Sequence, residues 1–373
     1  MNKKTLHIIA LDIPYPPNRG SVVGIFNRIK AFHEAGVEII LHAFYKEFKA
    51  PEDLAVYCKT VYLYKRKPIW NLIHLKVPLY IQSRRSDQLV QMLLKDESPI
   101  LFEGLHTLYH FNDPELSERR KYVRLHNEES VYYHHLSRLE NNPLKKIYYQ
   151  TEAGLSKFVE TNYLPKAHGL FTISIPETES FSKLNTNTLH TPPFITPSFK
   201  IPEGTGGYAL FHGDLTIREN ELAVHFLIRD VFNELDIPLI IAGFNPSPKL
   251  KNMVYASRQA TLMESPDTST MEILIQQAQI ILAPIKHTTG YKMKLVQSLF
   301  VGRHIITDEV ARSYTELKEL VHFAHNEHEW RKKIKQLINV PVSPLEIEAR
   351  RSLFESTFDN RKNAEKMLGL IFE

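Results

Sequence analysis

A short polar turn followed by two lysines is the part of this sequence best suited to bind an anion. The turn consists of His287, Thr288, Thr289 and Gly290. An apolar run at 280–285 precedes it and predicts a buried strand, and residues 291–301 then show a helical spacing of apolar side chains. Free backbone N–H groups and the helix dipole favour an anion at such a helix start, where Lys292 and Lys294 add positive charge. We therefore expect a phosphate group here; the alternative is that both lysines are solvated surface charges.

Polar side chains also follow two apolar strands in the first half of the chain. One strand, 99–103, is followed by His106, and the next, 121–125, contains Arg124 and leads into His126, Asn127 and Glu128. Because ligands bind at the carboxyl ends of strands in parallel α/β sheets, these five residues are candidate catalytic residues. The alternative for the histidines is a structural role, which is the commoner one for a single histidine.

A third candidate lies near the N-terminus, in a strand–helix–strand unit formed by residues 6–13, 22–32 and 37–44. The loop between the first strand and the helix ends in Arg19 and Gly20. Glycine allows a ligand to approach the backbone closely. The loop lacks a complete G-x-G-x-x-G pattern, so a nicotinamide-type dinucleotide site is not supported.

The elements that must position these residues alternate between strands and helices in both halves of the chain. This order predicts an α/β fold with two Rossmann-like doubly wound domains, and 373 residues is a suitable length for two. We expect an N-terminal domain at 1–190, a Pro- and Gly-rich linker at 191–207, a C-terminal domain at 208–345 and terminal helical sequence at 346–373.

The composition excludes several classes of protein. A net charge of +4 does not indicate a nucleic-acid-binding protein, and a single cysteine cannot form an internal disulfide. No apolar segment is long enough to span a bilayer, and no Asp-x-Asp or Cys/His cluster indicates a metal. We therefore expect a cytoplasmic protein with a metal-independent site. The stretch 65–70, with Lys65, Arg66, Lys67 and Trp70, has two interpretations: peripheral contact with anionic lipid on the inner face of the membrane, or a solvated basic edge.

Four segments together resemble the GT-B glycosyltransferases, in particular the large group that includes retaining sugar transferases. The order and spacing of the segments carry the resemblance along nearly the whole chain. They are the loop Asp12–Gly20, similar to the acceptor-side glycine loop; His212-Gly213-Asp214-Leu215; Ile241-Ala242-Gly243; and the G-x-K-x-K of Gly290, Lys292 and Lys294.

The resemblance implies two domains that face a cleft, with residues 346–373 returning to the N-terminal domain. It also implies hexosyl transfer from a nucleotide-sugar donor to a glycan or lipid-linked acceptor, in the synthesis of surface polysaccharides or glycoconjugates, with no further cofactor. The implied nucleotide-sugar-binding residues are Arg19, Gly20, Gly213, Asp214, Gly243, His287, Thr288, Thr289, Gly290, Lys292, Lys294 and Gln297.

One departure from the family pattern bears on activity. Many members carry two glutamates in the region of residues 280–302, and the matching positions here are Thr289 and Gln297. Glutamine can hydrogen-bond a ribose as donor and as acceptor, whereas Thr289 cannot supply a carboxylate. Two other functions therefore stay open: a GT-B-fold epimerase that acts on the nucleotide sugar alone, and a non-catalytic nucleotide-sugar-binding protein.

Overall fold

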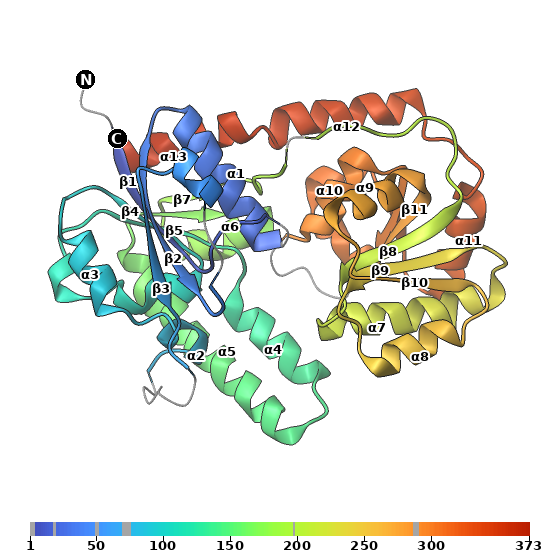
Figure 1. Ribbon diagram of the computed structural model, residues 1–373, viewed down its shortest axis with the longest axis horizontal. Coiled ribbons are helices and arrows are strands. Elements are labelled where there is room, and N and C mark those ends of the chain that lie inside the picture. The colour runs from blue at the N-terminus through green and yellow to red at the C-terminus, as the bar shows by residue number, and fades with distance from the viewer. Residues whose placement is uncertain (1–3, 18–19, 49–51, 69–75, 197, 286–290) are drawn as a thin grey trace. The chain divides into compact units, whose positions relative to one another are not determined.

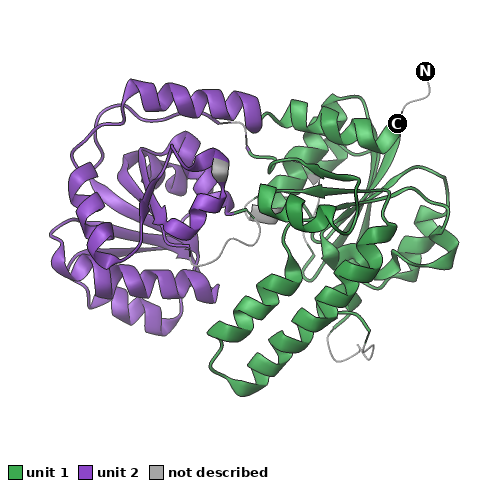
Figure 2. Cartoon of the chain, turned by 180° about the vertical axis from the view of Figure 1, so that it is seen from behind, with its two compact units in different colours: residues 1–195, 289–291, 358–373 green, residues 196–288, 292–357 purple. Residues whose placement is uncertain are grey.

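The computed structural model describes residues 4–17, 20–48, 52–68, 76–196, 198–285 and 291–373 (Figure 1). The chain divides into two compact units (Figure 2). Unit 1 contains residues 1–195, 289–291 and 358–373, and unit 2 contains residues 196–288 and 292–357. Each unit is built on its own parallel sheet, so the predicted α/β fold with two doubly wound domains is confirmed.

The sheet of unit 1 has the strand order β3-β2-β1-β4-β5-β6-β7, and its paired strands run parallel. Its strands are Thr5–Ala10 (β1), Glu38–Tyr45 (β2), Thr60–Lys65 (β3), Ile100–Glu103 (β4), Lys121–Arg124 (β5), Gly169–Thr172 (β6) and Thr188–His190 (β7). Its helices are Gly20–Glu34 (α1), Leu79–Gln82 (α2), Asp87–Leu93 (α3), Glu129–Leu139 (α4), Pro143–Tyr163 (α5), Ile175–Ser182 (α6) and Asn360–Phe372 (α13).

The sheet of unit 2 has the order β10-β9-β8-β11-β12-β13, again with parallel pairing. Its strands are Tyr208–Asp214 (β8), Leu239–Phe244 (β9), Ala260–Glu264 (β10), Ala278–Ala283 (β11), His304–Asp308 (β12) and His322–Ala324 (β13). Its helices are Arg218–Phe226 (α7), Pro248–Tyr255 (α8), Thr268–Gln277 (α9), Met293–Val301 (α10), Glu327–Leu337 (α11) and Pro344–Thr357 (α12).

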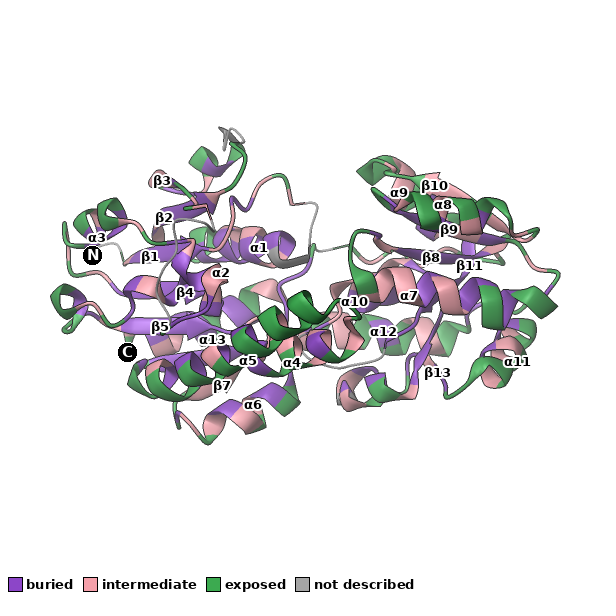
Figure 3. Cartoon of the chain, turned by 90° about the horizontal axis from the view of Figure 1, so that it is seen from below, coloured by how far each residue is buried: buried purple, intermediate pink, exposed green. Residues whose placement is uncertain are grey.

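The central strands are largely apolar because helices cover both faces of a doubly wound sheet. In β11, AQIILA, every residue is buried, including the polar Gln279. Burial is concentrated in the strands of both sheets, while the outer faces of the helices are exposed (Figure 3). Among the residues described, no helix is long and apolar enough to cross a bilayer.

Each sheet has one point at which the chain reverses its direction of winding. In unit 1 the strands proceed from β1 to β3 on one side and from β4 to β7 on the other, so the reversal lies between β1 and β4. In unit 2 the corresponding point lies between β8 and β11. Connections leave the two strands at such a point in opposite directions, which opens a crevice beyond their carboxyl ends where ligands bind.

The boundaries differ from the prediction at two places. The predicted linker, 191–207, begins too early: Thr191, Phe194 and Ile195 are almost fully buried in unit 1, after an additional strand, β7. Phe194 packs against Phe32 with ring centroids 6.4 Å apart, so this Pro-rich stretch contributes to the core without any regular periodicity.

The terminal segment, predicted to pack as a whole on the N-terminal domain, is divided between the units. Helix α12 belongs to unit 2, whereas α13 belongs to unit 1 and packs against α1. The buried face of α13, which includes Ala364, Met367 and Ile371, joins the core around β1 and β2. Within unit 2, Arg350 of α12 donates to the carbonyl oxygens of Leu299 and Gly302 and so holds this helix there.

Candidate functional site

A buried carboxylate stands at the switch point of unit 1. Glu103 is the last residue of β4, and its side chain is fully buried. Arg28 of α1 donates from Nε to Oε1 of Glu103 at 2.9 Å and also pairs with Oε2. On the other side, Nε2 of His126 lies 2.8 Å from the same Oε2. The carboxylate is thus held between a cation and an imidazole.

These contacts fix the chemical state of both groups. Burial alone would raise the pKa of Glu103, but the charge of Arg28 and the hydrogen bond from His126 outweigh it and lower this pKa to about 2. An ionised carboxylate only accepts, so Nε2 of His126 carries the proton and Nδ1 has a free lone pair. Burial lowers the pKa of His126, which keeps the ring neutral near pH 7. The arrangement can therefore accept a hydrogen bond from a substrate hydroxyl, as in a carboxylate-oriented catalytic histidine.

His106 lies beside this group, two residues after Gly104, whose φ of 77° favours glycine. Its ring stacks at a tilt on Tyr80, with centroids 4.5 Å apart, and its Nδ1 is buried 3.9 Å from a carboxylate oxygen of Glu129. Burial, followed by the positive charge of Arg84, holds the pKa of His106 well below its usual value. His106 is therefore a second neutral imidazole at the carboxyl end of β4.

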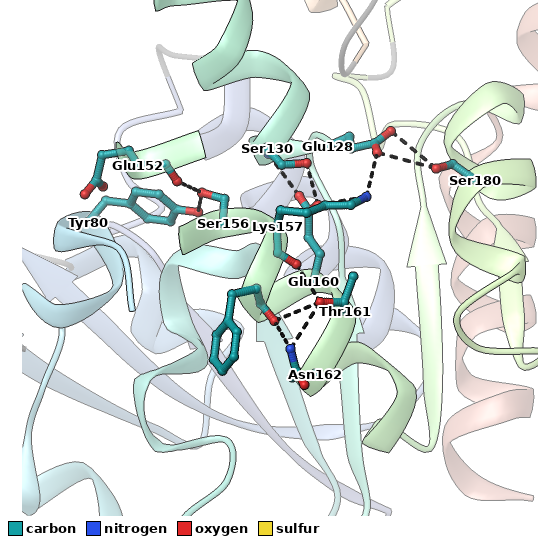
Figure 4. A network of polar contacts seen from close by, with 11 residues as sticks. Tyr80, Glu128, Ser130, Glu152, Ser156, Lys157, Glu160, Thr161, Asn162 and Ser180 are labelled. Carbon is teal, nitrogen blue, oxygen red and sulfur yellow. Dashed lines mark hydrogen bonds and ion pairs between the residues drawn. The ribbon is translucent and has the colours of Figure 1, made fainter. Parts of the chain in front are cut away.

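The residues behind His106 form a group of buried acids. Burial and the nearby Glu160 and Glu177 raise the pKa of Glu129 to about 8, so this side chain is largely protonated at neutral pH. Glu160 of α5 accepts from the backbone N–H of Ser130 at 3.0 Å and from its hydroxyl at 2.6 Å (Figure 4). These contacts join the start of α4 to α5 behind the two histidines.

Arg124, one of the predicted catalytic residues, is buried among backbone carbonyl oxygens. Its guanidinium is 1% exposed and donates to carbonyl oxygens of Thr191 at 2.7 Å and Pro192 at 3.0 Å. It also donates to the carbonyl oxygen of Thr172. The side chain points into the core from β5, because alternate residues of a strand face opposite sides of the sheet. Its contacts hold the segment after β7 on the sheet.

Asn127 and Glu128 lie between His126 and α4 and differ in their environments. The Oδ1 of Asn127 is buried with no hydrogen-bond partner among the residues described. The carboxylate of Glu128 lies 3.4 Å from the hydroxyl of Ser180 and 3.9 Å from the ammonium of Lys157, on the side of α5 and α6 (Figure 4). Of the five predicted catalytic residues, His106 and His126 are therefore the pair that the fold brings together with Glu103.

The switch point of unit 2 depends on two glycines in neighbouring strands. A Cβ atom on Gly243 of β9 would lie 2.0 Å from the carbonyl oxygen of Gly213 in β8, so no larger residue fits there. Next to them, the carboxylate of Asp214 accepts from the backbone N–H of Thr216 at 3.0 Å and from its hydroxyl at 2.5 Å. This turn ends just before α7, which begins at Arg218.

Lys294 supplies a positive charge at the switch point of unit 2. Its ammonium donates to Oδ1 of Asn220 at 3.0 Å and lies 4.6 Å from the centre of the Phe211 ring. Nδ2 of the same Asn220 donates to the carbonyl oxygen of Asp214 at 2.8 Å, which ties the lysine to the loop after β8. Burial and the charge of Lys292 lower the pKa of Lys294 to about 8, so it is still mostly protonated at pH 7. A cation held in this way can bind a phosphate oxygen.

The start of α10 differs by two residues from the prediction. The helix begins at Met293, with Lys292 as its N-cap residue and Lys294 in its first turn. Gln297 is half-buried one turn further along. Ser298, on the buried face, has its hydroxyl 3.1 Å from Nε2 of His212, and burial lowers the pKa of His212 to about 4.

Several predicted site residues fall outside the described part of the chain, namely Arg19, His287, Thr288, Thr289 and Gly290. Gly20 is the first residue of α1. Of the basic stretch, Trp70 is likewise outside the described residues, while Arg66 donates to the carbonyl oxygen of Leu11 at 2.7 Å and pairs with Asp12 at 3.3 Å. Arg66 thus supports the loop after β1 and is not part of a solvated basic edge.

Sequence reasoning missed four residues of these two groups: Arg28, Glu103, Glu129 and Asn220. Glu103 had a usable signal, since it is an acid that ends a buried strand. Asn220 follows the resembling segment at 212–215 by a few residues. Arg28 and Glu129 gave no signal in the sequence, because each lies on a helix where a charged residue is ordinarily exposed.

One further group could hold a metal ion. Within the described ranges, His304, His322 and Glu346 are the residues whose ligand atoms lie within 4.8 Å of one another. They lie at the amino ends of β12 and β13 and at the start of α12, away from the carboxyl-end residues described above.

Comparison with known sequences identifies a distant relative. No protein-family model matches the chain. A protein of Klebsiella pneumoniae described as an uncharacterized 44.6 kDa protein in the cps region is 26% identical over 328 residues, which is 83% of this chain and 84% of that protein.

Comparison with solved structures finds similar folds over the whole chain. A point mutant of S. aureus TarM, in complex with fondaparinux, alpha-GlcNAc-glycerol and UDP, aligns over 100% of both chains with a TM-score of 0.64 and 13% identity. A UDP-forming alpha,alpha-trehalose-phosphate synthase from Burkholderia xenovorans aligns over 99% of this chain and 100% of its own, with a TM-score of 0.66 and 10% identity. A glycosyltransferase from Rickettsia africae aligns over 100% of this chain and 98% of its own, with a TM-score of 0.65 and 11% identity.

Proposed function

We propose that this chain, which has the GT-B fold of those structures, is a glycosyltransferase that moves a sugar from a nucleotide-sugar donor to a glycan or lipid-linked acceptor. The observation that carries the proposal is the cation Lys294, held by Asn220 and Phe211 at the switch point of unit 2. Such a position suits the diphosphate of the donor. Unit 1 would supply His126 and His106 to the sugar or to the acceptor.

The donor side of the proposal rests on charge. When the bond between the anomeric carbon and the diphosphate breaks, negative charge develops on the leaving diphosphate and must be stabilised. Lys294, with Lys292 at the N-cap of α10, is the group that would do so without a metal ion. Gln297, on the same helix, would hydrogen-bond the ribose.

The acceptor side of the proposal rests on the tautomer of His126. His126 is neutral, its Nε2–H is directed at Glu103, and its Nδ1 is left to accept from a substrate hydroxyl. A positioned imidazole of this kind contributes about 10²–10⁴-fold to a reaction that requires proton transfer. His106, also neutral, would orient the sugar.

Uridine diphosphate sugars are the first donors to test, because UDP occurs in the TarM complex and the B. xenovorans synthase is described as UDP-forming. A role in polysaccharide synthesis is supported by the relative encoded in a cps region. A hexose is the sugar class we propose.

Contact with an anionic membrane is a further part of the proposal. The first two turns of α5 expose Leu144 and Ile147, which are 77% and 59% accessible, and place Lys145 and Lys146 between them. Exposed aliphatic side chains interleaved with lysines suit the headgroup region of anionic lipids. A lipid-linked acceptor would then be presented beside unit 1. Replacing both lysines with glutamate should abolish sedimentation with phosphatidylserine vesicles at low salt. The same replacement of the exposed Lys332 and Lys335 should leave sedimentation unchanged.

The transfer itself is tested by measuring nucleoside diphosphate release from a panel of nucleotide sugars, with and without polysaccharide and lipid-linked acceptors. We expect release to require an acceptor, and His126→Ala to lower kcat/KM by about 100-fold with little change in UDP affinity. His33→Ala, on the exposed side of α1, is the matched control and should behave as wild type.

Two outcomes would contradict the proposal. Conversion of a nucleotide sugar without any acceptor would identify an epimerase. Tight UDP binding without turnover on any acceptor in the panel would identify a binding protein.

A further inference from the structure

Three residues of unit 2 converge at the edge of its sheet opposite the phosphate-binding residues. His304 is the first residue of β12, His322 is the first residue of β13, and Glu346 lies in the first turn of α12. The two strands are parallel, and Ile306 of β12 lies opposite His322 of β13. His304 is two residues before Ile306 in β12, so its side chain points to the same face of the sheet as that of His322. The topology therefore places both imidazoles on one side, under α12.

The distance between the two imidazoles fits two ligands of one ion. Nδ1 of His304 lies 3.4 Å from Nε2 of His322. Two nitrogen ligands of a tetrahedral zinc ion, each about 2.0–2.1 Å from the metal, are themselves about 3.3–3.4 Å apart. A hydrogen bond with an N–H donor is ordinarily about 2.7–3.2 Å long, so this contact is long for a direct bond between the rings.

The tautomer of His304 also suits a ligand. Its Nε2 lies 2.7 Å from the carbonyl oxygen of Val340, which can only accept, so Nε2 carries the proton. Nδ1 therefore presents its lone pair toward His322 and Glu346. Metal-binding histidines usually have this arrangement, in which the second ring nitrogen donates to a carbonyl or a carboxylate and fixes the orientation of the ring.

The carboxylate of Glu346 is held in the same way. Arg350, one helical turn later, pairs with Oε1 of Glu346. Arg350 is itself fully buried and donates to the carbonyl oxygens of Leu299 at 3.1 Å and Gly302 at 3.0 Å. A ligand carboxylate supported by a buried arginine is prevented from turning away toward solvent.

We propose that His304 Nδ1, His322 Nε2 and the Glu346 carboxylate bind one divalent transition-metal ion, with zinc as the preferred ion. Two imidazoles and a carboxylate match the ligand types that zinc takes in proteins, and water would complete the fourth position. The ion would connect β12, β13 and α12, three elements that are distant in sequence. Its role is to stabilise unit 2, and it takes no part in the chemistry of sugar transfer.

The test uses untagged full-length protein, stripped with a chelator and titrated with Zn²⁺ by calorimetry and with Co²⁺ by visible absorption. We expect one ion per chain, the intense visible bands of tetrahedral Co²⁺, and a Tm that rises with Zn²⁺ because the ion binds the native state. His322→Gln should abolish binding. His328→Gln, an exposed histidine on α11, is the matched control and should bind as wild type.

Because His322→Gln could also disturb folding, Glu346→Gln is measured beside it, with circular dichroism of both metal-free variants. Loss of Zn²⁺ binding by at least tenfold in a folded Glu346→Gln supports the site. A wild-type protein that binds neither ion, or a pair of variants that keep wild-type stoichiometry, would overturn the proposal.

Discussion

The pH dependence of diphosphate binding follows from the position of Lys294. In the free protein, burial and the charge of Lys292 lower the pKa of Lys294 to about 8. A diphosphate beside the ammonium reverses both effects by pairing its charge, and should return the pKa toward the usual value of about 10.5. Binding must then be accompanied by proton uptake in the pH range between these two values.

The magnitude follows from the two pKa values. A group whose pKa is raised on binding contributes fully to affinity below the pKa of the free protein. Its contribution falls as the pH rises from that value and is lost as the pH passes the pKa of the complex. At pH 9 only about one lysine in ten is protonated in the free protein, so affinity should fall about tenfold from its value at pH 7, or about 1.4 kcal/mol. The terminal phosphate ionises near pH 6 and does not change over this range.

Calorimetry with UDP between pH 7 and pH 9 measures this effect, and repeating it at pH 8 in two buffers of different ionisation enthalpy measures the protons taken up. We expect about half a proton per UDP at pH 8. Lys294→Met keeps an apolar stem over Phe211 and should remove both the proton uptake and the pH dependence. Lys335→Met, an exposed position on α11, serves as the control.

The reasoning would be refuted by an affinity that is constant from pH 7 to pH 9, or by a Lys294→Met variant that retains the wild-type pH dependence. Unfolding midpoints of the variants distinguish loss of a contact from loss of structure, since Lys294 also holds Asn220.

Three further predictions concern stability. Glu103→Gln should reduce the free energy of unfolding at pH 7 by about 3–5 kcal/mol, because Arg28 is left buried and unpaired. Since the pKa of Glu103 is lowered to about 2 from 4.5, wild type should lose this advantage as the pH falls through that interval, and denaturant unfolding at pH 2–7 will measure it. Glu129→Gln should show the opposite dependence of stability on pH. The pKa of Glu129 is raised from 4.5 to about 8, so the wild-type protein should lose stability as the pH rises through that range, by up to about 1.4 kcal/mol per pH unit. The variant should not show this loss. Arg124→Met should destabilise unit 1 by about 3 kcal/mol by leaving buried carbonyl oxygens unpaired, as measured by urea unfolding, with unchanged UDP affinity.

Each of these predictions has an outcome that contradicts it. Acid unfolding of Glu103→Gln parallel to wild type would mean that the carboxylate is not ionised by its partners. Equal alkaline destabilisation of Glu129→Gln would place the titrating group elsewhere. A fully stable Arg124→Met would mean that Thr191 and Pro192 do not depend on the guanidinium.

The fold was predictable from the sequence because its signals are local. Apolar runs such as 280–285 and helical spacings such as that of 291–301 indicated most strands and helices, and the order of four short segments predicted the GT-B fold, which is confirmed. Very short strands were missed: β7 and β13 have three residues each, too few to show a period of two. The packing of Phe194 was missed for the same reason, since a Pro-rich stretch has no pattern that predicts burial.

By itself the sequence determined which residue types stand at strand ends, and so it indicated His106, His126 and Lys294. Only the tertiary structure decided what those residues contact. Arg124 and His126 are two positions apart on the same strand end, yet one donates to buried carbonyl oxygens and the other is oriented by Glu103, a residue from a neighbouring strand. Likewise, nothing near Lys294 in the sequence indicates Asn220, which lies 74 residues away. Charge state depends on burial and on partners brought from distant segments, and these are set by the packing of helices on sheets, which no local pattern encodes.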